Sequence, residues 1–171
     1  MQDQIFIWGM PGAGKSTIGQ QLAHKLGYSF FDLDQEIIAA NATSITDIFS
    51  HKGEDYFRQS EADLLRKLTG DHPTMVLATG GGAPCFHQNE KFMLAKGRCI
   101  FLDVPIKVLA QRLLDEGQAI RPLLKDVSPQ QLVNNLEQTL KIRNPYFRQA
   151  HIVVKGADIS VQQVLREMSA D

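Results

Sequence analysis

The sequence predicts an α/β protein in which five parallel strands form a sheet covered by helices on both faces. Three observations predict it: five short apolar stretches, helical spacing in the segments between them, and a length of 171 residues, which suits one domain. Apolar strands that alternate with helices are typical of parallel sheets with both faces covered. We therefore expect a single domain over residues 1–171 with three layers, α/β/α.

Each element has its own signal in the chain. Strands are expected at the apolar stretches 4–8, 28–32, 75–79, 98–103 and 151–154. Helices are expected over 15–26, 45–51, 54–69, 90–95, 106–115, 129–142 and 161–168. In the first helix apolar residues recur every four positions, and Gly27 after it is a typical C-terminal residue. Ser44, Ser128 and Ser160 predict later helix starts, because serine side chains cap helix N-termini.

Composition argues against several classes of protein. No apolar run approaches the roughly 20 residues of a membrane span. Cys85 and Cys99 are too far apart in the sequence for a metal-binding pair, and the five histidines are scattered. A net charge of −1 gives no positive field that would attract a polyanion such as nucleic acid. We expect a monomeric cytoplasmic protein whose partners are small molecules, with no nucleic acid and no membrane.

A phosphate-binding loop is predicted between the first strand and the first helix. Gly9-Met-Pro-Gly-Ala-Gly-Lys-Ser16 matches the pattern G-x-x-x-x-G-K-[ST] in the strand-to-helix context that the motif requires. Glycines let backbone N–H groups point at phosphate oxygens, and the helix N-terminus adds partial positive charge. Lys15 is expected at the β/γ-phosphates and Ser16 on Mg²⁺. The expected nucleotide-binding residues of this loop are Gly12, Ala13, Gly14, Lys15, Ser16 and Thr17.

Two carboxylates follow the second strand. Asp32 and Asp34 alternate in what reads as an extended segment, which would turn both toward the ligand crevice at the carboxyl end of the sheet. Asp32 could then hold hydrated Mg²⁺, and Asp34 could accept a hydroxyl proton. The alternative is that Asp34 caps the next helix and Asp32 is a solvated turn residue.

Arg58, the glycines 80–82 and Arg143 each have an ordinary explanation as well as a functional one. Arg58 has Glu54 and Glu61 at helical spacing, as in a surface salt-bridge ladder. Gly80, Gly81 and Gly82 follow a strand and could bring backbone N–H groups to a ligand, or form a flexible turn. Arg143 ends a predicted helix, where a cation is favourable in itself.

Taken in order along the chain, these motifs resemble the shikimate kinase family. The resemblance rests on the phosphate loop, Asp32-x-Asp34, Phe57-Arg58, the triple glycine, Arg121-Pro-Leu-Leu and Arg143-x-Pro-Tyr, and it spans nearly the whole chain. It implies the P-loop NTPase fold of the nucleoside monophosphate kinase type. It also implies phosphorylation of shikimate by ATP, with Mg²⁺, to shikimate 3-phosphate on the way to aromatic amino acids.

The resemblance also implies roles for particular residues. Asp34, Arg58, the triple glycine and Arg143 are the implied shikimate-binding set, and Asp34 and Arg58 belong to an implied substrate-binding helical segment of about residues 33–62. Arg121 is implied to meet the ATP phosphates from a lid at about residues 115–127, a segment without periodicity, and Arg112 to lie near adenine. The catalytic set is then Lys15, Asp34 and Arg121.

Two rival functions are left by the sequence. One is a P-loop kinase for another small metabolite, such as gluconate or a nucleoside monophosphate. The other is a nucleotide-dependent switch without an acceptor, against which stands the absence of Asn-Lys-x-Asp and Asp-x-x-Gly elements.

Overall fold

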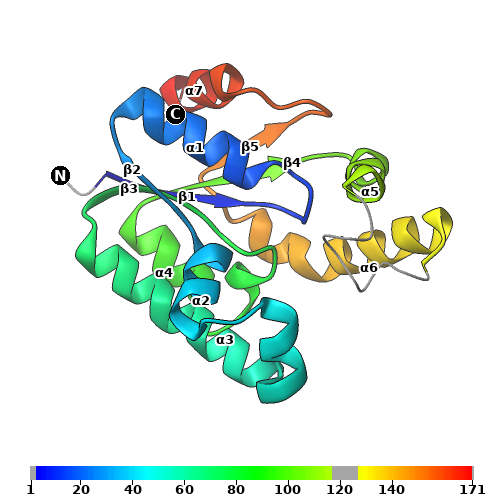
Figure 1. The fold of residues 1–171 in the computed structure, drawn as a ribbon. Helices are drawn as coiled ribbons and strands as arrows, with labels where there is room; N and C mark the ends of the chain where they lie inside the picture. Colours follow the sequence, from blue (N-terminus) through cyan, green and yellow to red (C-terminus); the bar gives the residue numbers. More distant parts are fainter. Residues whose placement is uncertain (1–2, 117–126, 171) are drawn as a thin grey trace.

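Five parallel strands form the centre of the molecule in the computed structural model, which describes residues 3–116 and 127–170 (Figure 1). Their order across the sheet is β2-β3-β1-β4-β5. The strands are β1 (Asp3–Trp8), β2 (Ser29–Asp32), β3 (Thr74–Ala78), β4 (Arg98–Asp103) and β5 (Ile152–Lys155). The prediction of a five-stranded parallel sheet is confirmed.

Helices follow the strands and cover the sheet. They are α1 (Lys15–Leu26), α2 (Leu33–Asn41), α3 (Ile45–Asp71), α4 (Asn89–Lys96), α5 (Ile106–Asp115), α6 (Pro129–Phe147) and α7 (Val161–Ala170), with a short 3₁₀ turn η1 (Ala83–Cys85). Figure 1 shows α1 and α7 above the sheet and α3 and α4 below it. The α/β/α layering predicted from the sequence is therefore confirmed.

The central strand β1 is in contact with helices on both faces of the sheet, so its side chains are buried on both sides. Gln4 donates to the carbonyl of Thr69 in α3, and the Trp8 indole N–H lies 3.3 Å from the sulfur of Met93 in α4. Side chains alternate along a strand, so Ile5 and Ile7 face the opposite layer, formed by α1 and α7. From Ile5 to Trp8 every residue of the strand is buried.

The helix caps are as predicted. Gly27 takes a left-handed φ of 71° after α1, and the hydroxyls of Ser44, Ser128 and Ser160 each accept from the backbone N–H three residues on. These local signals need no tertiary context, which is why they could be read from the sequence.

Three helical predictions need correction. Helix α2 was not expected as a separate element, although it lies inside the predicted helical segment 33–62. Helix α6 continues to Phe147 rather than ending at 142, because Pro145 is accommodated inside it. Arg143 is therefore not at a helix end.

The predicted break between residues 51 and 54 is confirmed, since Gly53 has a non-helical φ of 81° within α3.

No helix within residues 3–116 and 127–170 is both long and apolar enough to cross a membrane.

Candidate active site

The phosphate loop lies between β1 and α1, as predicted. Gly12 and Gly14 have φ of 80° and 87°, a left-handed conformation that favours glycine. Helix α1 starts directly after Gly14, whose carbonyl accepts from the N–H of Ile18 at 2.9 Å. The loop thus delivers the N-terminus of a twelve-residue helix to the carboxyl edge of the sheet, a favourable place for anionic phosphates.

Lys15 lies across this loop. Its Nζ donates to the carbonyls of Gly9 and Met10, both at 3.0 Å. The ammonium is therefore close to the backbone that would surround phosphate groups. A lysine stem has four rotatable bonds, so the charge can turn toward a ligand without movement of the loop.

Ser16 and Asp32 are in direct contact, since the Ser16 hydroxyl donates to the Asp32 carboxylate. The other carboxylate oxygen of Asp32 accepts from the N–H groups of Asp34 and Gln35, at 3.1 and 3.3 Å. Asp32 is therefore the N-cap of α2, and the alternative in which Asp34 caps this helix is wrong. The extended geometry expected for Asp34 is also wrong, because α2 has already begun at Leu33.

A cavity of about 280 Å³ lies over the loop and contains both carboxylates. It is lined by Pro11, Gly12, Gly14, Lys15, Ser16, Thr17, Asp32, Asp34, Thr79, Gly81 and Glu116. Of the predicted nucleotide-binding loop residues, Ala13 is the exception: it is buried, and its N–H donates to the carbonyl of Met10 at 3.1 Å. Asp32 and Asp34 thus share one site, although not for the expected reason.

The triple glycine after β3 is the floor of the acceptor side. A Cβ atom on Gly80 would lie 2.9 Å from Oδ1 of Asp34, and one on Gly81 would lie 2.9 Å from Nη1 of Arg143. A Cβ atom on Gly82 would lie 2.7 Å from Nη2 of Arg58. Three charged side chains that are far apart in the sequence therefore converge on three consecutive glycines.

Arg58 does form the pairs that a surface ladder would contain. Its Nε lies 3.3 Å from Glu54 and its Nη1 lies 2.9 Å from Glu61. However, the side chain of Arg58 is only 11% exposed and that of Glu61 is fully buried. The arginine is therefore held inside the site, and the salt-bridge explanation and the functional one apply together.

Glu61 is a site residue that the sequence reasoning did not single out. Burial raises its pKa to about 7, although the nearby Arg58 guanidinium favours the ionised form. Within the described residues its Oε1 is a buried oxygen without a hydrogen-bond partner, 2.8 Å from the Cβ position of Gly80. Its spacing from Arg58 was visible in the sequence, but its burial was not.

Arg143 reaches the same glycines from α6. Burial lowers the pKa of its guanidinium, and the charge of Arg58 acts in the same direction. Arginine stays protonated under such conditions, so two guanidinium groups meet here. Cys85 lies near both, and burial raises the pKa of its thiol to about 11, which keeps the thiol neutral near pH 7.

Arg112 joins the phosphate loop to the segment after β5. It donates to the carbonyl of Gly12 at 3.1 Å and to that of Ala157 at 2.7 Å. Both partners border the region expected to hold the nucleotide. Arg121 and most of the predicted lid at 115–127 lie outside the described residues.

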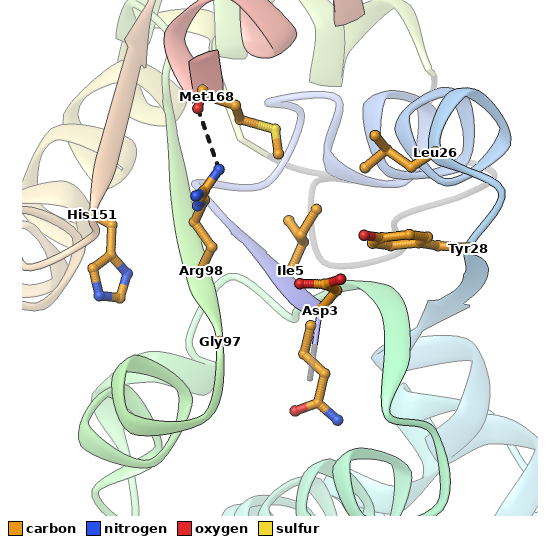
Figure 2. A pocket seen from close by; sticks show the side chains of 9 residues that line it. Asp3, Ile5, Leu26, Tyr28, Gly97, Arg98, His151 and Met168 are labelled. Carbon is orange, nitrogen blue, oxygen red and sulfur yellow. Dashed lines mark hydrogen bonds between the residues drawn. The ribbon is translucent and has the colours of Figure 1, made fainter. Parts of the chain in front are cut away.

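A second cavity, of about 380 Å³, lies at the opposite edge of the sheet, where the strands begin (Figure 2). Its lining includes Asp3, Tyr28, Arg98 and His151, and Arg98 donates to the carbonyl of Met168 in α7 at 3.3 Å. It contains none of the residues predicted from the sequence. Ligands of open α/β sheets bind at the carboxyl ends of the strands, so the cavity over the phosphate loop is the candidate active site.

Comparisons with known proteins show which family the chain resembles over most of its length. The family model described as "Shikimate kinase" matches residues 11–171. A shikimate kinase of Azobacteroides pseudotrichonymphae is 40% identical over 165 residues, 96% of each chain. A crystal structure of the Bacteroides thetaiotaomicron shikimate kinase superposes with a TM-score of 0.88 at 32% identity, covering 98% of this chain and 95% of that one. The Acinetobacter baumannii shikimate kinase in complex with shikimate gives 0.84 at 34% identity, covering 99% and 92%.

Proposed function

The chain belongs to the shikimate kinase family, and on this basis we propose which of its residues bind the substrates and which take part in phosphoryl transfer. The protein catalyses the ATP-dependent phosphorylation of shikimate, a step in aromatic amino acid biosynthesis. The γ-phosphoryl group passes to a hydroxyl of shikimate, giving ADP and shikimate 3-phosphate. The observation that best supports these roles is that Asp34, Arg58 and Arg143 converge on the triple glycine beside the phosphate loop.

The two arginines bind the acceptor carboxylate. A guanidinium fork can donate to both oxygens of a carboxylate, and two such groups adjoin Gly81 and Gly82. Of the three converging charged groups, Asp34 alone is an acid, and it also lines the cavity that contains the phosphate loop. A substrate with its carboxylate on the arginines can therefore present a ring hydroxyl to Asp34, which orients the hydroxyl or takes its proton.

The nucleotide phosphates lie over Gly12, Gly14 and the start of α1. On binding, the Lys15 ammonium turns from the carbonyls of Gly9 and Met10 to the β/γ-phosphates, where it neutralises charge that develops during transfer. Arg112 lies beside the nucleotide from its place on Gly12 and Ala157. By family resemblance, Arg121 completes the charge-stabilising set from the segment 115–127.

The residues at Ser16 fit a magnesium ion. Its hydroxyl and the Asp32 carboxylate are hard oxygen donors in direct contact, the kind that Mg²⁺ prefers. Ser16 would hold the ion, and Asp32 would bind it directly or through water. Mg²⁺ would supply neutralisation of phosphate charge. As expected from its sequence, we further propose that the enzyme works as a monomer in the cytoplasm.

A coupled ADP-release assay tests the acceptor assignment. Shikimate, quinate, gluconate and nucleoside monophosphates are compared side by side at equal concentration, with a no-acceptor control for a hydrolytic switch. We expect shikimate to be the preferred acceptor. Replacement of Arg143 by Ala should raise KM for shikimate about 30-fold or more and leave KM for ATP unchanged, because a charged partner of the carboxylate is lost. Lys141→Ala, on the same helix, is the matched control.

Equal turnover of gluconate or of a nucleoside monophosphate would overturn the acceptor assignment. ADP release at the same rate without any acceptor would favour a switch or an ATPase instead.

A further inference from the structure

The guanidinium of Arg58 lies between an aromatic ring and a glycine. Its Cζ is 4.1 Å from the centroid of the Phe86 ring, and a Cβ on Gly82 would lie 2.7 and 2.9 Å from its two terminal nitrogens. We propose that Phe86 is a positioning residue for shikimate binding, which holds the guanidinium of Arg58 against Gly82 in the place where the carboxylate is received. This inference rests on the proposed role of Arg58.

The two acidic partners of Arg58 do not by themselves set its position. Glu54 takes Nε and Glu61 takes Nη1, and both belong to the helix that carries the arginine. Both pairs therefore hold the guanidinium from the side of its own helix, and neither holds it from the side of the glycines. Within the described residues the hydrogen bonds of Arg58 are made by Nε and Nη1, so Nη2, the nitrogen nearest Gly82, is available to a carboxylate.

The Phe86 ring supplies the missing restraint. A cation over an aromatic face is attracted by the ring quadrupole, and more strongly where water is excluded. The Arg58 side chain is only 11% exposed, so this contact is largely desolvated. The ring of Phe57 lies 5.0 Å from Cζ as well, but it belongs to the same helix, whereas Phe86 comes from the segment after the triple glycine.

The segment that carries Phe86 is itself fixed to α3. Arg66, two turns beyond Arg58, donates to the carbonyl of His87 at 3.0 Å and to the side chain of Asn89 at 2.8 Å. Buried Asn89 in turn donates to the carbonyl of Ala83 at 3.0 Å. Arg66 of α3 therefore holds the segment that carries Phe86, and this places the Phe86 ring against Arg58 of the same helix.

Core packing does not explain Phe86, because 36% of its surface is exposed. Most large apolar side chains in residues 3–116 and 127–170 are buried, whereas the Phe86 ring is partly exposed and lies against the Arg58 guanidinium. Its replacement should therefore affect substrate binding more than folding.

The test compares shikimate use with and without the ring. Phe86→Leu should raise KM for shikimate about 3- to 30-fold and leave kcat and KM for ATP within about twofold, while Phe86→Tyr should behave as wild type. Tyr56→Leu is the matched control: Tyr56 is 41% exposed, and its ring centroid lies 4.3 Å from the ammonium of Lys52, a residue with no proposed role in substrate binding. Thermal unfolding verifies that each variant folds, and Phe86→Gln replaces Phe86→Leu if that protein does not.

A double variant separates positioning from direct contact. In the Arg58→Ala background, Phe86→Leu should have no further effect on KM, because the ring acts through Arg58. An equal effect in both backgrounds would overturn the proposal and place Phe86 on the substrate itself. If Arg58→Ala alone leaves KM for shikimate unchanged, the proposed acceptor site is wrong. If Arg58→Ala raises KM and Phe86→Leu does not, only the inference about Phe86 is wrong.

Discussion

Nη2 of Arg58 lies so close to Gly82 that a Cβ atom there would stand 2.7 Å away, closer than such atoms approach in proteins. The same holds for Gly81 and Nη1 of Arg143, and for Gly80 with Asp34 and Glu61. A side chain at any of these three positions would therefore displace the charged group beside it from its place in the site.

Replacement of Gly82 by Ala should weaken the binding of shikimate and leave the protein folded. Its φ of −100° is open to alanine, and the atoms displaced belong to the flexible end of Arg58, so the fold should persist. The guanidinium must move, and we expect KM for shikimate to rise at least about tenfold, the loss of roughly one charge-assisted hydrogen bond. Gly70→Ala, where a Cβ meets nothing within 4 Å, is the control. A normal KM in Gly82→Ala would contradict this steric role.

Lys15→Met should abolish phosphoryl transfer and leave the fold intact. The ammonium donates to the loop carbonyls of Gly9 and Met10 and is not part of the hydrophobic core. Turnover by ADP release should fall to less than about a tenth, with an unchanged circular dichroism spectrum. Lys25→Met, in the last turn of the same helix, should keep full activity. Retention of more than that tenth by Lys15→Met would refute its proposed role.

Asp34→Asn should lower kcat strongly, by about 10²- to 10⁴-fold, with a smaller change in KM for shikimate. The amide keeps the shape of the carboxylate beside Gly80 but does not accept the hydroxyl proton. Steady-state kinetics with shikimate varied at saturating ATP measure both constants. Near-normal turnover would exclude a base or essential orienting role for this carboxylate.

The pKa of Glu61 predicts a pH dependence of stability. Because burial raises this pKa to about 7 from 4.5, the folded protein holds a proton that the unfolded chain releases between these values. The free energy of unfolding should therefore fall as pH rises from about 4.5 to about 7, by at most about 3 kcal/mol from this group. The lowered pKa values of Asp47 and Asp71 act below this window.

Urea unfolding of wild type and Glu61→Gln at pH 5 and pH 8 measures this contribution, because other titrating groups are common to both proteins. Wild type should lose more stability than the variant between the two pH values. An identical loss in both would mean that Arg58 keeps Glu61 ionised throughout.

Local signals explain what could be predicted. The alternation of strands and helices, the serine caps and Gly27 depend on residues within a few positions of one another, and all are found in the structure. The phosphate loop is of the same kind, since its glycines and Lys15 are consecutive. Helix α2 was missed as a separate element because its start depends on the Asp32 carboxylate, which reads equally well as part of an extended segment.

The acceptor side could not be worked out from spacing alone. Arg58 with Glu54 and Glu61 has the same sequence pattern whether the helix face is solvated or buried, and only the family resemblance favoured a role in binding. The structure adds that the Glu61 side chain is fully buried, and that Phe86 comes to the arginine from 28 positions along the chain. Neither fact is encoded in a local pattern.

The sequence by itself determined the fold class, the phosphate loop and the family, because these follow from periodicity, glycine and lysine spacing, and a series of short motifs. Only the tertiary structure decided which charged groups meet. Asp34, Arg58 and Arg143 come from three different helices and touch three consecutive glycines, and burial there sets the pKa of Glu61. Burial and close approach depend on how the helices are placed on the sheet, and that placement is a property of the whole chain.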